Sequence, residues 1–259
     1  LHKMEYRGYD SAGIALHQDD KIAHLRTLGK VKLLEEKMIS EKPRSKLGIA
    51  HTRWATHGEP SEENAHPHKS NERVYIVHNG IIENYLDLKD FLKKEGYSFS
   101  SQTDSELIAH MLEYFLSKDN TMLDAMYLTK EKLDGAYAIA AIDKEDDTNI
   151  IIARSKSPLL IGVGIDEFLA ASDPLAIGQL TNEFIFLEDG DVAEISSQSY
   201  TIYDESKNKV DREITNIDIS SQATSKGEYK HFMEKEIYEQ PEAILNTIDG
   251  RVGGDDVLD

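Results

Sequence analysis

Three short polar segments carry the side chains in this sequence that are best suited to chemistry. Arg53 heads the string RWATHG at 53–58, and its guanidinium could hold a carboxylate through two parallel hydrogen bonds. The neighbouring Trp54, the only tryptophan, could close over a small ligand and exclude water. Asn79-Gly80 follows an apolar run, and an Asn amide beside a Gly N–H could form an oxyanion hole.

Each of these features also has a purely structural interpretation. Arg53 could be a surface residue stacked on a half-buried Trp54. Asn-Gly is the commonest signal for a tight turn, so Asn79-Gly80 could simply reverse the chain. Asp104 stands just before a helical pattern and could be a helix N-cap. Local sequence alone leaves both interpretations open.

Histidines are concentrated in the first third of the chain, where five of the ten lie between positions 51 and 78. A bound metal is therefore the first hypothesis, and the close spacing in His66-Pro67-His68 is compatible with it. No HExxH pattern and no acidic cluster of ligand spacing accompanies them, so we expect no metal. The interpretation we favour is that they are hydrogen-bonding loop residues. The five are His51, His57, His66, His68 and His78.

Composition excludes several classes of protein. No cysteine is present, so these residues can supply no disulfide, thiolate zinc site or cysteine nucleophile. Lys+Arg is 29 and Asp+Glu is 48, and the net charge of −19 argues against nucleic-acid and anionic-membrane partners. The longest apolar run, 136–142, is far shorter than the ~18 residues of a membrane span. The absence of GxSxG, GxGxxG and Walker A patterns argues against serine hydrolases, dinucleotide enzymes and P-loop NTPases.

The elements that must position these side chains follow from apolar periodicity. Helical spacing prevails in the first half, and short strands with short links in the second half predict an antiparallel meander. Asp189-Gly190 is a hairpin signal within its strand. This distribution favours the α+β class over an alternating parallel fold. Predicted helices are 29–42, 84–95, 104–117 and 122–133; predicted strands are 12–16, 22–28, 47–52, 74–77, 136–142, 149–154, 159–163, 167–171 and 183–195; 55–71 is a predicted loop.

Taken together, the ordered motifs resemble one family over essentially the whole chain. They resemble the glutaminase domain of the glutamine–fructose-6-phosphate aminotransferases, which form glucosamine 6-phosphate. Related class II amidotransferases share only the Arg, Asn-Gly and Asp elements, whereas RWATHG and the segment 230–244 separate this family from them. The matching motifs are EYRGYDSAG at 5–13, HTRWATHGEPSEENAHPH at 51–68, VHNGIIENY at 77–85, TDSE at 103–106, GAYAIAAI at 135–142, SPLLIGVG at 157–164, FLEDGDVAEI at 186–195 and KHFMEKEIYEQPEAI at 230–244.

The resemblance implies an N-terminal-nucleophile hydrolase fold, a four-layer α+β sandwich with two antiparallel sheets between helix layers. It implies that residues 1–203 form a glutaminase domain that lacks its first strand. Residues 204–259 would be a terminal strand remnant and a linker toward a sugar isomerase domain. Against the family pattern both ends look truncated, and the nucleophilic Cys is missing. We therefore expect the chain alone to be inactive as a glutaminase.

The resemblance also implies roles for individual residues. In the family, the thiol of an N-terminal Cys attacks the glutamine amide, assisted by its own α-amino group, and the ammonia released aminates fructose 6-phosphate at the isomerase domain. Asn79 and Gly80 would form the oxyanion hole, and Arg7 would lie near the nucleophile. Arg53 would bind the α-carboxylate of L-glutamine and Asp104 its α-ammonium. The remaining pocket residues would be Trp54, Thr56, His57 and His66.

Partners and location follow from the same resemblance. We expect no cofactor, L-glutamine and fructose 6-phosphate as small-molecule partners, and a homo-oligomeric full-length enzyme. The opening LHKMEYRGYD lacks the apolar core of a signal peptide, so the expected location is the cytoplasm. Two alternatives stay open: a non-catalytic glutamine-binding module, and a sister class II amidotransferase such as a purine-pathway enzyme.

Overall fold

The computed structural model divides the chain into two compact units, Leu1–Asp218 and Ile219–Asp259. The candidate site residues Arg7, Thr56 and His57 lie outside the described part of the chain. The residues that the structure describes are 1–6, 8, 10–18, 20–55, 58–218, 229, 232–248, 252–253 and 256–257.

A seven-stranded antiparallel sheet with the strand order β13-β12-β11-β7-β6-β5-β4 is the centre of the first unit. Along β5 and β6 the side chains alternate between the two faces, as the period of a strand requires. Ile76 and Ile139 point to one face, and Tyr75 and Ile142 to the other. The strands are β4 (His68–Ser70), β5 (Val74–Ile82), β6 (Gly135–Asp143), β7 (Ile150–Ser155), β11 (Val192–Ile195), β12 (Tyr200–Tyr203) and β13 (Lys209–Val210).

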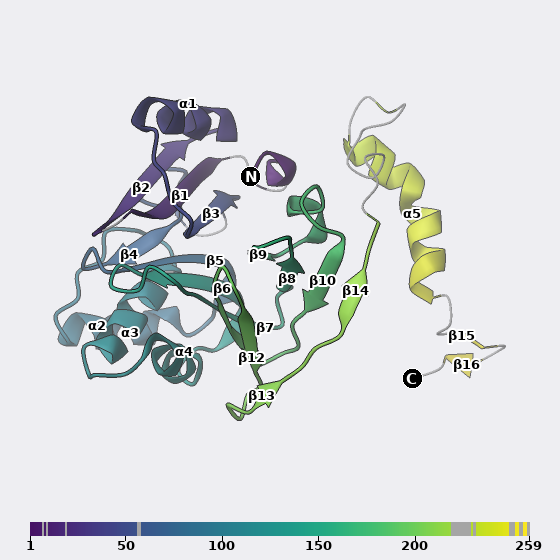
Figure 1. Cartoon of the computed structure of the whole chain (residues 1–259). Helices are drawn as coiled ribbons and strands as arrows, with labels where there is room; N and C mark the ends of the chain where they lie inside the picture. The colour runs from purple at the N-terminus through teal and green to yellow at the C-terminus, as the bar shows by residue number, and fades with distance from the viewer. Residues whose placement is uncertain are drawn as a thin grey trace. The chain divides into compact units, whose positions relative to one another are not determined.

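Three helices cover one face of this sheet: α2 (Tyr85–Lys94), α3 (Glu106–Leu116) and α4 (Met122–Lys130) (Figure 1). The largest hydrophobic cluster lies between them and the sheet. α3 is buried over most of its length, which explains why apolar residues occupy nearly all of its positions. The side chain of Thr121 caps α4 by accepting from the N–H of Asp124.

The opposite face of the sheet packs on two smaller antiparallel sheets, of order β2-β1-β3 and β14-β10-β8-β9. α1 (Val31–Glu41) forms the outer layer over β1 and β2 through Val31 and Leu34. The first unit therefore has the expected helix–sheet–sheet–helix order, with the second sheet layer in two pieces. The strands are β1 (Ser11–Gln18), β2 (Lys21–Leu28), β3 (Gly48–Arg53), β8 (Leu160–Val163), β9 (Phe168–Ala171), β10 (Glu183–Phe186) and β14 (Ile214–Asn216).

The two pieces of the second sheet layer each have an unpaired edge beside the chain start. Among the described residues β3 pairs only with β1, and β9 pairs only with β8. Figure 1 shows the N-terminal 3-10 turn η1 (His2–Met4) above both β3 and β9 in this view. A second such turn, η2 (Pro174–Ala176), follows β9 and contacts η1. The unpaired edges frame the cavity described below.

Most predicted elements are confirmed within a few residues, but the turn alternative for Asn79-Gly80 and the predicted hairpin at Asp189-Gly190 are wrong. Asn79 and Gly80 do not reverse the chain; they lie inside β5 and pair with β6. The predicted strand 183–195 is also not a hairpin at Asp189-Gly190. It contains β10 and β11, which belong to different sheets, so this segment carries the chain from one sheet layer to the other.

Several elements were missed in segments interpreted as loop or linker. The predicted loop 55–71 contains the short strand β4. The second unit contains α5 (Phe232–Ile248) and the short strands β15 (Val252–Gly253) and β16 (Asp256–Val257). β14 pairs with β10 and belongs to the first unit, which ends at Asp218.

Candidate active site

A cavity of about 640 Å³ lies between the seven-stranded sheet and the open edges of β3 and β9. Small side chains line much of it, including Ala50 from β3, Ala138 and Ala140 from β6, and Ala170 from β9. The first residue, Leu1, also contributes to its wall. Six of the candidate residues predicted from sequence line this cavity: Arg53, Trp54, His66, Asn79, Gly80 and Asp104.

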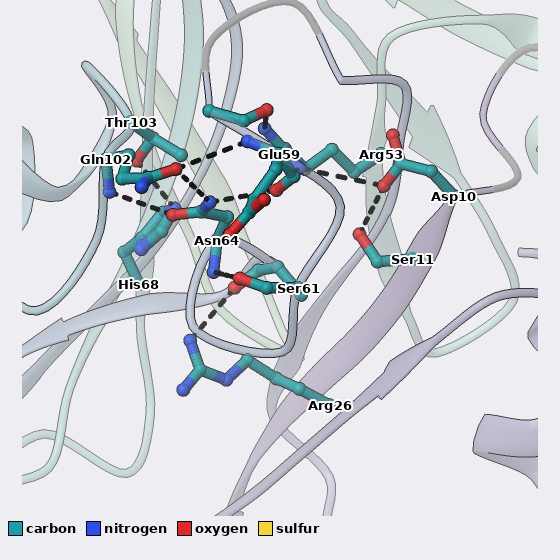
Figure 2. Close-up of polar contacts among 12 residues, drawn as sticks. Asp10, Ser11, Arg26, Arg53, Glu59, Ser61, Asn64, His68, Gln102 and Thr103 are labelled. Carbon is teal, nitrogen blue, oxygen red and sulfur yellow. Dashed lines mark hydrogen bonds and ion pairs between the residues drawn. The ribbon is translucent and has the colours of Figure 1, made fainter.

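Arg53 supplies a buried cation at the end of β3. Its residue is only 5% exposed, so the surface interpretation is wrong. The guanidinium lies 3.7 Å from Asp10 Oδ1 and donates to the backbone carbonyls of Gly58 (3.3 Å) and Glu59 (3.5 Å) (Figure 2). Arg53 thus places a planar guanidinium at the cavity wall, and such a group can hold a carboxylate.

Asp104 supplies the opposing anion just before α3, and it is equally buried at 4% exposed. Its Oδ2 accepts from the N–H of Ile82 at the end of β5 (2.8 Å). Ser105, not Asp104, occupies the N-cap position of α3. The Ser105 hydroxyl lies 2.8 Å from His78 Nδ1 and donates a long bond of 3.4 Å to Asp104 Oδ1. Asp104 is thus tied to the end of β5 and to the start of α3.

Asn79 and Gly80 lie in β5, opposite Ala138 and Tyr137 of β6. By strand alternation Asn79 shares the face of Ala138, which lines the cavity. Gly80 has φ +140°, and a Cβ there would lie 2.0 Å from the backbone oxygen of Ala136. This position therefore requires glycine for a strained, close pairing of the two strands. Both residues are exposed to the cavity side rather than packed in the core.

Three buried histidines and the partly buried His51 form the wall behind these groups. The rings of His51 and His66 stack with centroids 4.3 Å apart, and those of His66 and His68 meet edge to face at 4.6 Å. His66 Nδ1 accepts from the backbone N–H of His78 (3.2 Å). His68 Nε2 lies 3.1 Å from the Thr103 hydroxyl, next to Asp104. The expected hydrogen bonding is confirmed for His66, His68 and His78, but the expected loop position is wrong for His51, His68 and His78, which lie in β3, β4 and β5.

The histidines of this wall are neutral at pH 7. Burial lowers the pKa of His51 and of His78 to about 4, and that of His68 to about 3. Burial also holds the pKa of His66 well below its ordinary value. Among the described residues no group of three or more histidine, aspartate or glutamate side chains is arranged to hold a metal ion. The cluster therefore forms an uncharged wall between the cation and the anion.

Trp54 lies at the rim of the cavity and is 57% exposed. The residues that continue its loop, Thr56 and His57, lie outside the described part of the chain, as does Arg7. Sequence reasoning missed Asn64 and Gln102, which join the loop after Arg53 to the loop before Asp104. It also missed Glu106, whose carboxylate accepts from the N–H and hydroxyl groups of Ser100 and Ser101. The run of polar residues SSQTDSE at 100–106 could have indicated Gln102 and Glu106.

Sequence comparison finds one set of relatives over the whole chain. A family described as "Glutamine amidotransferase domain" matches residues 51–179. The chain is 49% identical over 259 residues to a glutamine–fructose-6-phosphate aminotransferase (isomerizing) of Vibrio parahaemolyticus, covering 100% of this chain and 42% of the relative. It is 50% identical over 260 residues to the enzyme of that name from Haemophilus influenzae, with the same coverage. The chain thus spans less than half the length of these relatives.

Comparison of folds finds amidotransferases as well. The glutamine phosphoribosylpyrophosphate amidotransferase of B. subtilis, solved with ADP and GMP, matches with a TM-score of 0.69 at 26% identity. That match covers 81% of this chain and 46% of the solved chain. A structure described as the allosteric regulatory enzyme of purine biosynthesis matches with a TM-score of 0.70 at 28% identity, covering 80% and 45%.

Proposed function

The chain belongs to the glutamine amidotransferase family of the glutamine–fructose-6-phosphate aminotransferases, and we propose that it binds L-glutamine and releases ammonia from its side-chain amide. Its fold is the α+β fold of the N-terminal-nucleophile hydrolases. The whole enzyme would pass the ammonia to fructose 6-phosphate and form glucosamine 6-phosphate. This chain would supply the glutamine-binding part of that reaction.

The observation that carries the proposal is that a buried cation, Arg53, and a buried anion, Asp104, line one cavity together with the amide donor Asn79. A free amino acid presents a carboxylate and an ammonium, which match Arg53 and Asp104. The neutral histidines add no further charge that could pair with the carboxylate or the ammonium of the amino acid. Asn79 and the N–H of Gly80 would then stabilise negative charge on the oxygen of the side-chain amide.

The nucleophile must come from outside the present sequence, which holds no cysteine. We propose that a strand ahead of Leu1 fills the space between the unpaired edges of β3 and β9. Three observations support this: the two edges face one cavity, Leu1 lies in the cavity wall, and alanines leave room for a backbone. Residues 1–203 would then be a glutaminase domain lacking its first strand, and 204–259 its terminal strand and linker.

In the proposed mechanism a thiol on that strand attacks the side-chain carbonyl carbon of glutamine, and the α-amino group of the same cysteine takes the thiol proton. Asn79 and Gly80 stabilise the tetrahedral oxyanion. Collapse of this intermediate breaks the C–N bond, and ammonia leaves with the proton returned to it. Water then hydrolyses the thioester to glutamate. Arg7, Thr56 and His57 would complete the site, and Trp54 would cover it.

The remaining features of the whole enzyme are also proposals. Fructose 6-phosphate would bind at a separate isomerase domain of the whole enzyme, which would be a cytoplasmic homo-oligomer. No helix among the described residues is both long enough and apolar enough to cross a membrane. The purine-pathway alternative is disfavoured, because identity is 26% and 28% to the phosphoribosylpyrophosphate and purine enzymes and about twice that to the relatives above.

The decisive experiment compares the chain with a version extended at its N-terminus by a strand that begins with Cys. We expect the extended protein to release glutamate and ammonia from glutamine, and the same extension with Cys→Ala to release neither. Calorimetric titration with glutamine accompanies the assay. Binding without hydrolysis by a well-folded Cys-extended protein would favour the non-catalytic binding module, and no binding by either version would refute the proposal.

A further inference from the structure

Two loops adjoin the charged groups of the cavity. The loop that follows β3 begins directly after Arg53, and the loop that leads into α3 ends with Asp104 and Ser105. Arg53 reaches the first loop through the carbonyls of Gly58 and Glu59. The separation of cation and anion therefore depends on how these two loops are held together.

A pair of amide side chains joins the loops, as Figure 2 shows. Asn64 Oδ1 accepts from the backbone N–H of Gln102 (2.8 Å), and Asn64 Nδ2 donates to Gln102 Oε1 (3.2 Å) and to the carbonyl of Glu59 (2.9 Å). Gln102 Oε1 also accepts from the N–H of Glu59 (3.3 Å). We refer to the Asn64–Gln102 pair as the amide clasp. The carbonyl of Glu59 is shared by the amide clasp and the guanidinium of Arg53.

The clasp is tightly packed on its first-loop side. Asn64 is only 2% exposed, and its backbone N–H is fixed by the Ser61 hydroxyl (3.2 Å). Gly58 has φ +77°, and a Cβ there would lie 2.8 Å from Asn64 Nδ2 and 2.9 Å from Gln102 Cβ. Glycine is thus required where the backbone passes over the clasp.

On the other side the clasp connects directly to Asp104. Gln102 is followed by Thr103, whose hydroxyl contacts His68, and then by Asp104 itself. The start of this loop is held by Glu106 through Ser100 and Ser101. Gln102 is therefore the position where the Asp104 loop meets the Arg53 loop.

We propose that Asn64 and Gln102 are positioning residues that set the separation of Arg53 and Asp104, and thereby the selection of a free α-amino acid. This inference rests on the proposed function. Neither amide touches the reacting amide bond; each acts through a loop that carries a charge. Loosening the clasp should weaken the simultaneous grip on carboxylate and ammonium and leave the chemical step unchanged.

The test uses the Cys-extended protein, two variants at Gln102 and one control variant at Gln198, and both positions are exposed. Gln102→Ala removes the acceptor of two hydrogen bonds, and we expect it to raise KM for glutamine about 3- to 10-fold with kcat within about twofold. Gln102→Glu keeps an acceptor oxygen in place and should restore KM to within about threefold of the parent. Gln198→Ala, at an exposed glutamine outside the lining of the cavity, should match the parent.

Specificity supplies a second measurement. With the clasp intact, an analogue of glutamine that lacks the α-ammonium should be a poor competitor, because Asp104 is then left without its partner. Gln102→Ala should lower the ratio of the affinity for glutamine to the affinity for this analogue. A purely structural role would instead lower kcat and the melting temperature together.

The outcomes separate the two proposals. If the parent hydrolyses glutamine and Gln102→Ala has the KM and specificity ratio of the parent, the clasp proposal is overturned and the proposed function stands. If Gln102→Glu raises KM for glutamine as much as Gln102→Ala does, the proposed role of the Gln102 side-chain oxygen as a hydrogen-bond acceptor is overturned. If the parent neither binds nor hydrolyses glutamine, both proposals fail together.

Discussion

Arg53 shows how residue type and burial combine to define the proposed substrate. The guanidinium is almost fully buried, yet its contacts with Gly58 and Glu59 are long and its ion pair with Asp10 is at 3.7 Å. A planar guanidinium can hold a carboxylate through two parallel hydrogen bonds, which a lysine ammonium cannot do. The charge alone is therefore not sufficient, and the planar geometry should matter.

The first prediction follows from that geometry. Arg53→Lys keeps the positive charge but loses the fork, so kcat/KM for glutamine hydrolysis by the Cys-extended protein should fall by about 10-fold or more. Arg44→Lys, at an exposed arginine, is the matched control and should leave kcat/KM unchanged. A value for Arg53→Lys close to that of the control would exclude the bidentate role.

Asn79 is expected to act at a different stage from Arg53. Its amide matters most when negative charge develops on the substrate oxygen, so Asn79→Ala should lower kcat by about 10²–10³-fold and change KM little. Steady-state kinetics over a range of glutamine concentrations separates the two constants. An effect on KM alone would make Asn79 a ground-state ligand instead.

The buried histidines make stability depend on pH. Their pKa values in the folded protein, about 4 for His51 and His78, lie below the ordinary value of 6.5. Between these limits the unfolded chain binds more protons, so the free energy of unfolding should fall as the pH drops from about 6.5 to about 4. Each such group contributes up to about 1.4 kcal/mol per pH unit. Urea denaturation at pH 7 and pH 5 measures the difference.

A matched pair of variants assigns this pH dependence to the buried cluster. His51→Gln should reduce the loss of stability between pH 7 and pH 5, because it removes one of the titrating groups. His2→Gln changes an exposed histidine at the protein surface and should leave the loss unaltered. Equal slopes for His51→Gln and the parent would show that other groups cause the pH dependence.

A site residue could be predicted from sequence where its type and its neighbours in sequence indicate its role. Arg53 and Asp104 could be selected from sequence because their charges and neighbouring motifs suggest a ligand. The structural alternatives failed for physical reasons, since Arg53 is buried and Asp104 holds β5 rather than capping α3. Asn64 and Gln102 could not be selected, because common polar loop residues gain their role only from a contact 38 residues away in sequence.

Among the elements, β5 gives the clearest lesson about local signals. Asn-Gly favours a tight turn, but the pairing of Asn79 and Gly80 with β6 overrides that preference. The same holds for Asp189-Gly190, where a turn occurs but the flanking strands join different sheets. Apolar periodicity predicted the helices well because α2 and α3 each bury one continuous face. Sheet membership depends on distant partners, which periodicity does not contain.

The strain at Gly80 leads to a prediction for this element. Gly80→Ala should destabilise the fold by about 3 kcal/mol or more, because the new methyl would meet the Ala136 carbonyl and the backbone is in a region that favours glycine. Gly96→Ala is the control: its φ is +95°, but no atom lies within 4 Å of the added Cβ. It should cost only about 1 kcal/mol. Denaturant midpoints of both variants test the difference.

For the whole molecule, the unpaired edges of β3 and β9 predict a gain in stability on extension. A strand placed between them would bury backbone and apolar surface and add about 3 kcal/mol, which corresponds to a melting temperature about 6–12 °C higher. The chain without the extension should release no ammonia from glutamine above a blank without protein, since no thiol is present. Equal melting temperatures for the two proteins would contradict the proposed place of the strand.

The residues that line the cavity extend in sequence from Leu1 to Ile177. Groups so distant in sequence come together only when both sheet layers have docked, and contacts of that range form slowly. A growing polypeptide would therefore hold a complete pocket only after most of the unit had left the ribosome. The ability to bind glutamine should consequently arise only late in synthesis, when the pocket is complete. A partly made chain would then not release ammonia from glutamine.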